Sequence, residues 1–567
     1  MGAFLWMDDG LAEKPEGKEA CAVFLAQSGP CRELPAGAGR LWLAAASAVP
    51  DMPFAENDHE FTAFTGTPFA RGSGTVDSLA KRLSSGACSY EQLQGGFVLL
   101  QGSADKLQIR GDRLGQQHIF GSANDQVFST SFLATATAAG NQPVNLQALR
   151  EYVFFGATYG GETLSAGVSL LPAGATIVLD SNGANIKTCA PVPSIPFKGD
   201  FTDAVTETAD ALRDVFAAIV DTYPSIDTAL SAGFDTRLML ALLRTVGAKD
   251  FALHVYGAKT SADVQIASMI AAGEGLKLAC KDKAAVPALD AGGWMAQIEK
   301  NYLAFDGLPP DGIIDSGSDL ASRQTRAAAG RLALNGGGGE ILRNFFYLPD
   351  RPFSLRGLLD SFYRRYDPAI CGDGFDETGF RAALGQKILQ SVGLDGDLAT
   401  RLARQDIERV YPLFRGRYWM DANTSRNLRL GRAATPFASA ELVALTSGMP
   451  YGFKNYGRLQ AAIIKHLDPA LAAYPSDYGF NFADGPGMAY RLKSMPSLYR
   501  PLWLRRMSYK LQHRRWPVPV KPAGLDADLW QGGALEPFFN RDLMRDAAQI
   551  KRLASAACLV SRLGLKV

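Results

Sequence analysis

One stretch of the chain, residues 229–238, limits its fold more than any other. Its letters are ALSAGFDTRL: an apolar run ends in small and hydroxyl residues, and a helical pattern begins at once. The apolar run 251–256 and the helical pattern that starts at Asp263 then repeat this alternation. Alternating strands and helices predict an α/β unit built on a parallel sheet.

The turn inside this stretch has the composition of an anion-binding loop. Small residues such as Ser231, Ala232 and Gly233 let backbone N–H groups approach a phosphate, and the N-terminus of the following helix adds partial positive charge. Asp235 would place a carboxylate beside that anion, which is favourable when Mg²⁺ lies between the two. The alternative is an ordinary strand-to-helix turn in which Asp235 caps the helix.

A second loop of the same kind follows the strand-like run 332–334. It consists of Asn335, four glycines from Gly336 to Gly339, and Glu340. In an open α/β sheet, ligands gather at the carboxyl ends of strands near a switch point. Two loops with one carboxylate each suit the phosphate chain of a Mg-bound nucleotide, whereas the alternative for the second loop is a flexible glycine turn.

The two loops together resemble those of the asparagine-synthetase-like superfamily, which includes asparagine synthetase, β-lactam synthetase and the lasso peptide cyclases. The first is similar to the superfamily's SGGxDS loop, with Ala232 for one glycine and Thr236 for the last serine. The second is similar to SGxGxDE, with Glu340 in place of the aspartate. The resemblance implies a doubly wound PP-loop α/β domain with many helices, an ATP-binding synthetase domain, over residues 196–567.

The N-terminal part, residues 1–195, has a different pattern. Short apolar runs between turn residues predict strands at 41–46, 96–100, 106–110, 127–130 and 175–179, with a helix at 146–155. Segments 95–100 and 112–115 resemble the superfamily's glutaminase domain, an Ntn-hydrolase αββα sandwich. Its glutamine-using members need a cysteine nucleophile at position 2, and here that residue is Gly2. We therefore expect a multidomain α/β protein whose first domain is a degenerate glutaminase-like domain.

The resemblance also implies an ATP-dependent ligase. In the superfamily, a carboxylate attacks the α-phosphate of ATP to give an acyl-adenylate and pyrophosphate, and an amine then displaces AMP. Asp235 and Glu340 are thereby implied as catalytic Mg²⁺ ligands, and Tyr478 is a further catalytic candidate. The residues implied to bind ATP are Ser231, Ala232, Gly233, Phe234 and Thr236 in the first loop, Val255 and Tyr256 beside adenine, and Asn335, Gly336, Gly337 and Gly338 in the second loop.

Two departures from the superfamily's pattern concern the amide-forming step. The second loop has Gly337 where active members carry an acidic residue, and segment 474–480 has Asp477 where they carry a lysine. The nearby lysines, either substitutes or ordinary surface residues, are Lys454, Lys465 and Lys493. Two catalytic alternatives stay open, and the substrate is a carboxylate in both. One is a lasso-type cyclase that acts on a precursor peptide, and the other is an enzyme that acts on a small metabolite or a surface polysaccharide. A non-catalytic nucleotide-binding scaffold is the other alternative.

Composition narrows the classes of partner. The chain has 58 Lys and Arg residues against 57 Asp and Glu, so its net charge of +1 gives no bulk attraction to nucleic acid. No apolar run approaches the roughly 18 residues of a transmembrane segment. Seven scattered cysteines without a CxxC pair indicate a reduced, cytoplasmic protein.

A basic stretch with interleaved aromatic residues, 499–516, is the last feature that stands out. It is either an amphipathic helix that binds an acidic peptide, a partner protein or a membrane surface, or a solvated helix whose Trp and Leu side chains pack on the core.

Overall fold

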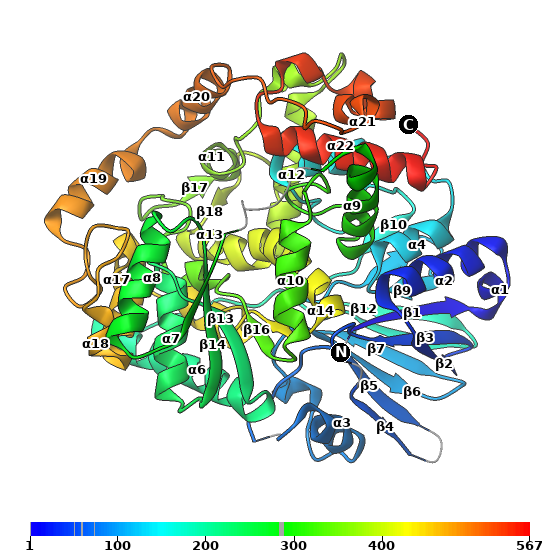
Figure 1. The fold of residues 1–567 in the computed structure, drawn as a ribbon, viewed down its shortest axis with the longest axis horizontal. Coiled ribbons are helices and arrows are strands. Elements are labelled where there is room, and N and C mark those ends of the chain that lie inside the picture. Colours follow the sequence, from blue (N-terminus) through cyan, green and yellow to red (C-terminus); the bar gives the residue numbers. More distant parts are fainter. Residues whose placement is uncertain (1, 50–51, 58–59, 73, 283–288) are drawn as a thin grey trace.

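The structure is a computed structural model that describes residues 2–49, 52–57, 60–72, 74–282 and 289–567. It is a multidomain α/β protein with three large sheets and many helices (Figure 1). Among the described residues, no helix combines the length and the apolar composition that crossing a lipid bilayer needs.

Two antiparallel sheets are built from the N-terminal part of the chain. The first has the order β10-β8-β9-β1-β3-β2, from strands β1 (Gly2–Asp8), β2 (Cys31–Pro35), β3 (Gly39–Ala45), β8 (Phe120–Ser122), β9 (Val127–Ser129) and β10 (Val168–Leu170). The second has the order β12-β11-β7-β6-β5-β4, from strands β4 (Phe54–Glu56), β5 (Phe61–Gly66), β6 (Phe97–Gly102), β7 (Leu107–Gly111), β11 (Thr176–Asp180) and β12 (Gly183–Lys187).

These two sheets pack face to face because alternate residues of their strands are apolar. Phe4 and Trp6 of the first sheet share a buried cluster with Val98 and Ile109 of the second. On the outer side of the first sheet, α2 (Pro15–Ser28) and α4 (Phe132–Ala139) cover the other face of β1. Helix α3 (Val76–Ser84) covers the outer side of the second sheet. The layers therefore follow the order helix, sheet, sheet, helix.

The third sheet is parallel and has the order β15-β14-β13-β16-β19. Its strands are β13 (Ser225–Ala229), β14 (Asp250–Tyr256), β15 (Leu278–Lys281), β16 (Leu332–Leu334) and β19 (Ala433–Ala434). The chain proceeds from β13 outward to β15 and then returns to the other side of β13 to form β16 and β19. The order of strands therefore reverses between β13 and β16, which makes this the switch point of a doubly wound sheet.

Helices flank this sheet and position the loops at its carboxyl edge. The helices that matter for the site are α6 (Phe201–Thr222), α7 (Phe234–Thr245), α8 (Ala262–Gly273), α10 (Ser318–Ala328), α14 (Asp421–Leu430) and α17 (Arg458–Leu467). Apolar residues of α7 and α8 pack on β14 in one cluster, and α6 and α17 contribute to a larger cluster with β13 and β16. By register, both clusters cover the same face of the sheet. On the other face, Arg326 of α10 forms an ion pair with Asp227 of β13.

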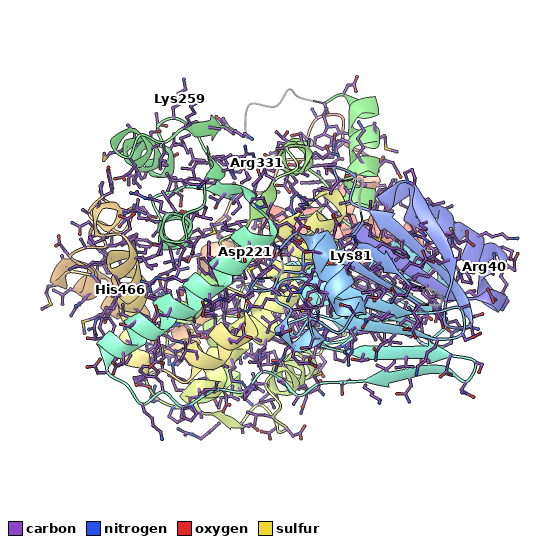
Figure 2. All side chains as sticks on the ribbon, turned by 90° about the horizontal axis from the view of Figure 1, so that it is seen from below. Arg40, Lys81, Asp221, Lys259, Arg331 and His466 are labelled. Carbon is purple, nitrogen blue, oxygen red and sulfur yellow. The ribbon has the colours of Figure 1, made fainter. Side chains whose placement is uncertain are left out.

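Polar contacts join the N-terminal sheets to the rest of the chain. Asp221, near the end of α6, accepts a hydrogen bond from the Gly72 amide at 3.2 Å (Figure 2). Lys387, on α12 (Glu377–Ser391), forms an ion pair at 2.8 Å with Glu151, on α5 (Leu146–Phe155). Neither of these last two side chains is more than 7% exposed, so their charges depend on each other.

The elements predicted from local pattern are present. Helix α5 spans the predicted residues, as does β16, and the strands expected at 41–46, 96–100, 106–110, 127–130 and 175–179 correspond to β3, β6, β7, β9 and β11 within two residues. The C-terminal part is mostly helical, as expected, and includes α19 (Met488–Tyr499), α20 (Leu502–His513) and α22 (Ala547–Arg562).

Candidate functional site

The first loop connects β13 to α7 at the switch point of the parallel sheet. The Thr236 hydroxyl accepts a hydrogen bond from the Ser231 amide at 3.0 Å and lies 2.9 Å from the Ser231 hydroxyl, which closes the loop. The Ala232 amide donates to the Asp263 carboxylate at 3.0 Å. Helix α7 has Gly233 as its N-cap, and no side chain caps its first amides. Those amides are therefore available to an anion.

The second loop follows β16 and lies directly against the first. A Cβ atom on Gly339 would lie 2.1 Å from Asp235 Oδ1, and one on Gly337 would lie 2.2 Å from the Met420 sulfur. Gly336 approaches the Asp235 side chain as well, and Gly338 has a φ of +89°. Gly337 and Gly339 are therefore required because neighbouring side chains lie too close for a Cβ atom, and Gly338 is required because its φ is left-handed. The second loop thus has a defined conformation, unlike a flexible glycine turn.

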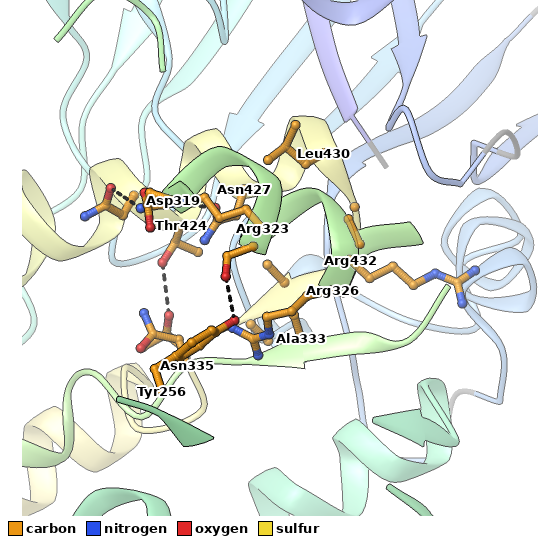
Figure 3. A pocket seen from close by; sticks show the side chains of 17 residues that line it. Tyr256, Asp319, Arg323, Arg326, Ala333, Asn335, Thr424, Asn427, Leu430 and Arg432 are labelled. Atoms are coloured by element: carbon orange, nitrogen blue, oxygen red, sulfur yellow. Dashed lines mark hydrogen bonds and ion pairs between the residues drawn. The ribbon is translucent and has the colours of Figure 1, made fainter. Parts of the chain in front are cut away.

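A pocket of about 230 Å³ lies beside the second loop, between the sheet and helices α10 and α14 (Figure 3). Tyr256, at the end of β14, and Asn335, directly after β16, both line it. The Tyr256 hydroxyl accepts a hydrogen bond from Ser322 at 3.1 Å. Val255 points to the opposite face of β14 and is buried among the apolar residues of α7 and α8, so its side chain does not line this pocket.

The two carboxylates predicted to act together do meet, through an arginine. One guanidinium nitrogen of Arg343 lies 2.9 Å from Asp235 and 3.5 Å from Glu340. The Gln460 side-chain amide donates to the other oxygen of Asp235 at 2.8 Å, and the Tyr411 hydroxyl donates to Glu340 at 2.5 Å. All four oxygens of the two carboxylates are thus near a donor or a positive charge.

Burial sets the electrostatics of this group. Burial raises the pKa of Asp235 to about 6, an effect that the Arg343 charge opposes and the Glu340 charge reinforces. The two carboxylates in turn raise the pKa of Arg343, against the effect of its burial. Burial and the Glu340 charge also raise the pKa of the Tyr411 hydroxyl well above its usual value. The arginine is therefore the fixed positive charge of the site.

These residues do not fit a resident magnesium ion as they stand. Mg²⁺ requires near-octahedral oxygen ligands and commonly takes one or two carboxylates together with phosphate oxygens. Asp235 and Glu340 are such a pair, but the Arg343 guanidinium lies between them and supplies the positive charge. No group of three His, Cys, Asp or Glu side chains suited to a metal occurs in the part of the chain that the structure describes. Magnesium binding by these two residues stays a prediction.

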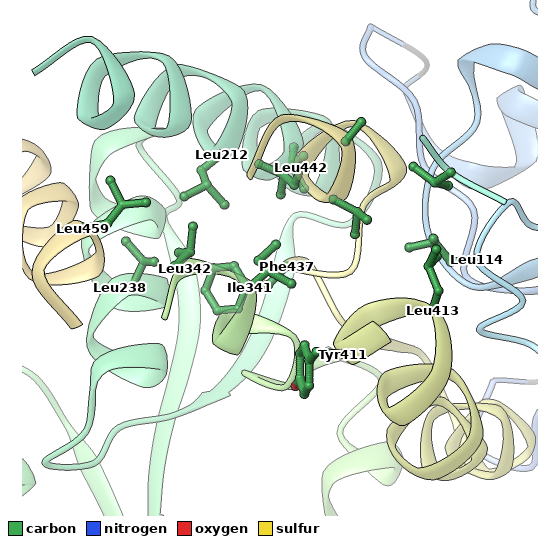
Figure 4. Close-up of a cluster of buried hydrophobic side chains, with 14 of the residues drawn as sticks. Leu114, Leu212, Leu238, Ile341, Leu342, Tyr411, Leu413, Phe437, Leu442 and Leu459 are labelled. Atoms are coloured by element: carbon green, nitrogen blue, oxygen red, sulfur yellow. The ribbon is translucent and has the colours of Figure 1, made fainter. Parts of the chain in front are cut away.

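The second loop is held in place by the apolar residues that follow Glu340. Ile341 and Leu342 are buried in the cluster that contains Leu238 of α7, Leu459 of α17 and Phe437 (Figure 4). In the short 3₁₀ turn from Gly339 to Leu342, the Glu340 side chain therefore faces the first loop, whereas the Ile341 and Leu342 side chains lie in the core. A carboxylate on such a turn is held rigidly.

Tyr478 lies over the first loop, and its catalytic role stays a prediction. Its ring centroid is 4.7 Å from that of Phe234, which in turn stacks on Phe482 at 4.3 Å. Burial raises the pKa of Tyr478 to about 12, although the nearby Arg343 charge lowers it. The hydroxyl therefore keeps its proton at neutral pH and is a donor at the mouth of the loop.

The interpretation of Lys454 as an ordinary surface lysine is wrong. Its side chain is 1% exposed, and its ammonium group forms an ion pair with Glu408 at 2.8 Å. Burial lowers the pKa of Lys454, and the Glu408 charge opposes that effect. Lys465 and Lys493 are exposed, as expected of surface lysines.

Gly2 is buried at the start of β1, opposite Ala45 of β3. A Cβ atom there would lie 2.1 Å from the carbonyl oxygen of Ala44. The strand therefore has no room for a larger side chain at this position as it stands. That the first domain does not hydrolyse glutamine stays a prediction.

Sequence reasoning did not find three of the residues that complete the site. Arg343 follows Glu340 by three positions, a spacing that brings side chains together on one helical turn and was therefore a usable signal. Gln460 and Tyr411 reach the carboxylates from elements 225 and 71 positions away, and the local sequence contains no signal for them.

Comparisons with known proteins leave the family open. No protein-family model matches the chain, and neither does any curated protein. Among solved structures, the allosteric regulatory enzyme of purine biosynthesis is similar at 10% identity over 49% of this chain and 65% of that one, with a TM-score of 0.22. Glutamine phosphoribosylpyrophosphate amidotransferase from B. subtilis, complexed with ADP and GMP, has 9% identity, the same coverage and the same TM-score.

Glutamine-dependent NAD⁺ synthetase from Acinetobacter baumannii, in complex with ADP, has 20% identity over 31% of this chain and 33% of that one, with a TM-score of 0.16. The chain thus matches less than two thirds of the length of each of these structures. Their TM-scores are too low to support an argument about fold or activity, so any function must be inferred from the geometry of the chain itself.

Proposed function

We propose that the chain is an ATP-dependent ligase that activates a carboxylate and couples it to an amine without hydrolysing glutamine. The observation that carries this proposal is the meeting of two loops at the switch point of a parallel sheet. One loop offers the uncapped amides of α7, and the other brings Glu340 to Asp235 and Arg343. Such an arrangement is suited to a phosphate chain.

In the proposed reaction, an oxygen of the substrate carboxylate bonds to the α-phosphorus of ATP, and the bond from that phosphorus to pyrophosphate breaks. The nitrogen of an amine then bonds to the acyl carbon, AMP leaves with the bonding electron pair, and the amine loses a proton. The α7 amides and Arg343 would stabilise the phosphate charge that develops, while the Tyr478 hydroxyl would donate to a phosphate oxygen. The neighbouring pocket, which Asn335 and Tyr256 line, would take the nucleoside.

The buried Gly2 supports a reaction whose amine comes from solution or from the substrate itself. A precursor peptide that carries its own amine, as for a lasso-type cyclase, is one such substrate, and a small metabolite or a surface polysaccharide is another. A second candidate function is a non-catalytic nucleotide-binding scaffold, which is favoured by the engagement of both carboxylates with Arg343.

Thermal unfolding with and without ATP tests nucleotide binding first. A ligand at a hundred times its Kd adds about 2.7 kcal/mol of stability, which shifts the midpoint by a few degrees. The wild type should shift and Thr236→Val, which removes the hydroxyl that closes the first loop, should not. Pyrophosphate release in the presence of candidate carboxylates then separates a ligase from a scaffold. A wild type that ATP and AMP leave unchanged would contradict both candidates.

A further inference from the structure

A large cavity of about 670 Å³ lies beside the carboxylates, beneath α19. We call it the cationic chamber, because six basic residues line it: Arg343, Arg364, Arg365, Lys493, Arg500 and Arg505. Glu340 is the one acidic residue among its lining residues, and it lies at the end of the chamber nearest the loops.

Two of the six cations are already engaged by protein groups. Arg343 faces Asp235 and Glu340. Arg505 is buried and donates to the backbone carbonyls of Phe346, Tyr347, Ser497 and Leu498. These contacts direct Arg343 toward the two loops and Arg505 into the chamber wall, so the remaining four cations face the space of the chamber itself.

The remaining four cations have no acidic partner among the described residues. They are Arg364, Arg365, Lys493 and Arg500, and no ion pair joins any of them to an aspartate or glutamate in that part of the chain. Burial, together with the charges of Arg505, Arg365 and Arg500, lowers the pKa of Arg364 to about 10. Arg364 is half-buried, and the other three are exposed. Gathering like charges around the half-buried Arg364 costs free energy unless an anion compensates them.

Aromatic side chains form another wall of the chamber. Phe345 and Phe362 have ring centroids 5.0 Å apart, and Phe346 packs on Phe362 at 5.6 Å. Tyr347 and Tyr490 also line the space. A ligand that fits here therefore has an apolar or aromatic portion as well as negative charge.

From these observations we propose that the cationic chamber binds the acyl substrate of the ligase, and that this substrate carries at least two negative groups besides an apolar portion. This inference rests on the proposed function, since it places the substrate beside the two loops. The shared chemistry is that of a polyanion, whose charges are carboxylates or phosphates. Arg364 and Arg365 would bind one negative group and Arg500 another.

Binding of pyranine, a fluorescent aromatic trisulfonate, tests the chamber without the unknown substrate. Fluorescence anisotropy should give saturable binding to the wild type, weakened at least tenfold in the Arg364→Gln/Arg365→Gln variant. The matched control is Arg491→Gln/Arg515→Gln, which removes two arginines of the same region that do not line the chamber. Equal loss in both variants would show general charge attraction and overturn the proposal.

Competition and nucleotide binding complete the test. Displacement of pyranine by citrate and not by glucose 1,6-bisphosphate would identify carboxylates, and the reverse would identify phosphates. Displacement by neither would overturn a polyanion site. The ATP-dependent thermal shift should be unchanged in Arg364→Gln/Arg365→Gln. Pyranine binding without any ATP shift would leave the chamber standing and contradict the nucleotide part of the proposed function.

A separate observation concerns the outer faces of α19 and α20, which run along the edge of the molecule (Figure 1). Ten of the seventeen large apolar side chains that are exposed in the described residues fall between 488 and 520. Seven of them recur at spacings of three or four within each helix, and we call them the apolar stripe: Met488, Leu492, Met495 and Tyr499 on α19, and Trp503, Met507 and Leu511 on α20. The expectation that Trp and Leu of this stretch pack on the core is therefore wrong for Trp503 and Leu511, which are 61% and 57% exposed.

The charge of the residues around the apolar stripe indicates the kind of surface that it binds. Residues 485–525 contain nine Lys and Arg residues and no Asp or Glu, in a chain whose net charge is +1. Arg506 and Arg514 anchor α20 to the body of the molecule through Glu377 and Asp367. The helices are thus held in place, while their apolar stripe stays exposed together with Arg491, Lys493, Arg500 and Arg515. Helices with Trp and Leu on one face and Lys and Arg beside it bind at lipid–water interfaces.

We propose that the apolar stripe binds the surface of an anionic lipid bilayer. Co-flotation with vesicles should recover the wild type with phosphatidylcholine containing 30% phosphatidylglycerol, and far less with phosphatidylcholine alone. Trp503→Ser/Leu511→Ser should reduce recovery at least fivefold. Met269→Ser/Met295→Ser removes two exposed apolar residues elsewhere and should leave recovery unchanged. Recovery that is the same for all three chains would overturn the proposal, as would self-association that the stripe variant abolishes without any vesicle binding.

Discussion

The Arg343 guanidinium lies 2.9 Å from the Asp235 carboxylate, although the two residues are 108 positions apart. This contact joins the loop after β13 to the loop after β16. Because the same guanidinium is 3.5 Å from Glu340, one positive charge serves both carboxylates. The site therefore contains a cation of its own. Substitution of Arg343 tests whether the two carboxylates also need a metal ion.

Arg343→Met should create a requirement for magnesium. Without the guanidinium, two carboxylates face each other and attract a divalent cation. Titration calorimetry should detect Mg²⁺ binding to Arg343→Met and little or none to the wild type or to Arg343→Lys, which keeps a positive charge. If the wild type binds ATP only when Mg²⁺ is present, the arginine does not substitute for the metal and the ligand assignment made from the sequence is right.

Stability should fall with rising pH because of Asp235. Its pKa in the folded chain, about 6, is above the value of about 3.9 in an unfolded chain. The contribution of Asp235 is then fully present below pH 4 and is lost as the pH rises through 6, by roughly 1 to 3 kcal/mol. Urea unfolding of the wild type and Asp235→Asn between pH 4 and 7 measures this difference. Parallel pH profiles for the two proteins would contradict it.

Gly339→Ala should disrupt the site by steric contact alone. Its Cβ atom would lie 2.1 Å from an Asp235 oxygen, so one of the loops must move. Overpacking of this kind costs about 1 to 3 kcal/mol, and the ATP-dependent thermal shift should disappear. Gly452→Ala is the matched control, because a Cβ atom at that helical position has nothing within 4 Å. Retention of the full ATP shift by Gly339→Ala would show that the two loops are not in close contact.

Lys387→Met should destabilise the contact between the N-terminal sheets and α12. The change leaves Glu151, whose side chain is 0% exposed, without its ion-pair partner, at a cost of about 3 to 5 kcal/mol. Burial raises the pKa of Glu151, so the variant should regain stability as the pH falls and this carboxyl becomes neutral. The double change Glu151→Gln/Lys387→Met should restore most of the loss in chemical denaturation, and a double variant as unstable as the single one would refute this account.

What could be predicted from the sequence depended on how local the signal was. The helix at 146–155 begins after Asn145, whose side chain caps it, and that signal lies next to the element it defines. The meeting of the two loops followed from a general property of parallel sheets, and Asp235 and Glu340 both contact Arg343 there. Their predicted role as magnesium ligands is not tested by this geometry. Lys454 was misplaced because its burial depends on Glu408, 46 positions away. The exposure of Trp503 could not be predicted either, because apolar residues at helical spacing give the same sequence pattern whether the fold buries them or leaves them exposed.

The buried start of β1 has a consequence for how this chain could change. A single substitution is not enough to introduce a nucleophile there, because the side chain of Gly2→Cys would overlap the Ala44 carbonyl oxygen of the neighbouring strand. Compensating shifts in β3 would have to come first, and each would disturb the sandwich without benefit. For the ligase proposed above, a new source of nitrogen would therefore have to arise at the carboxyl edge of the parallel sheet and not at the start of β1.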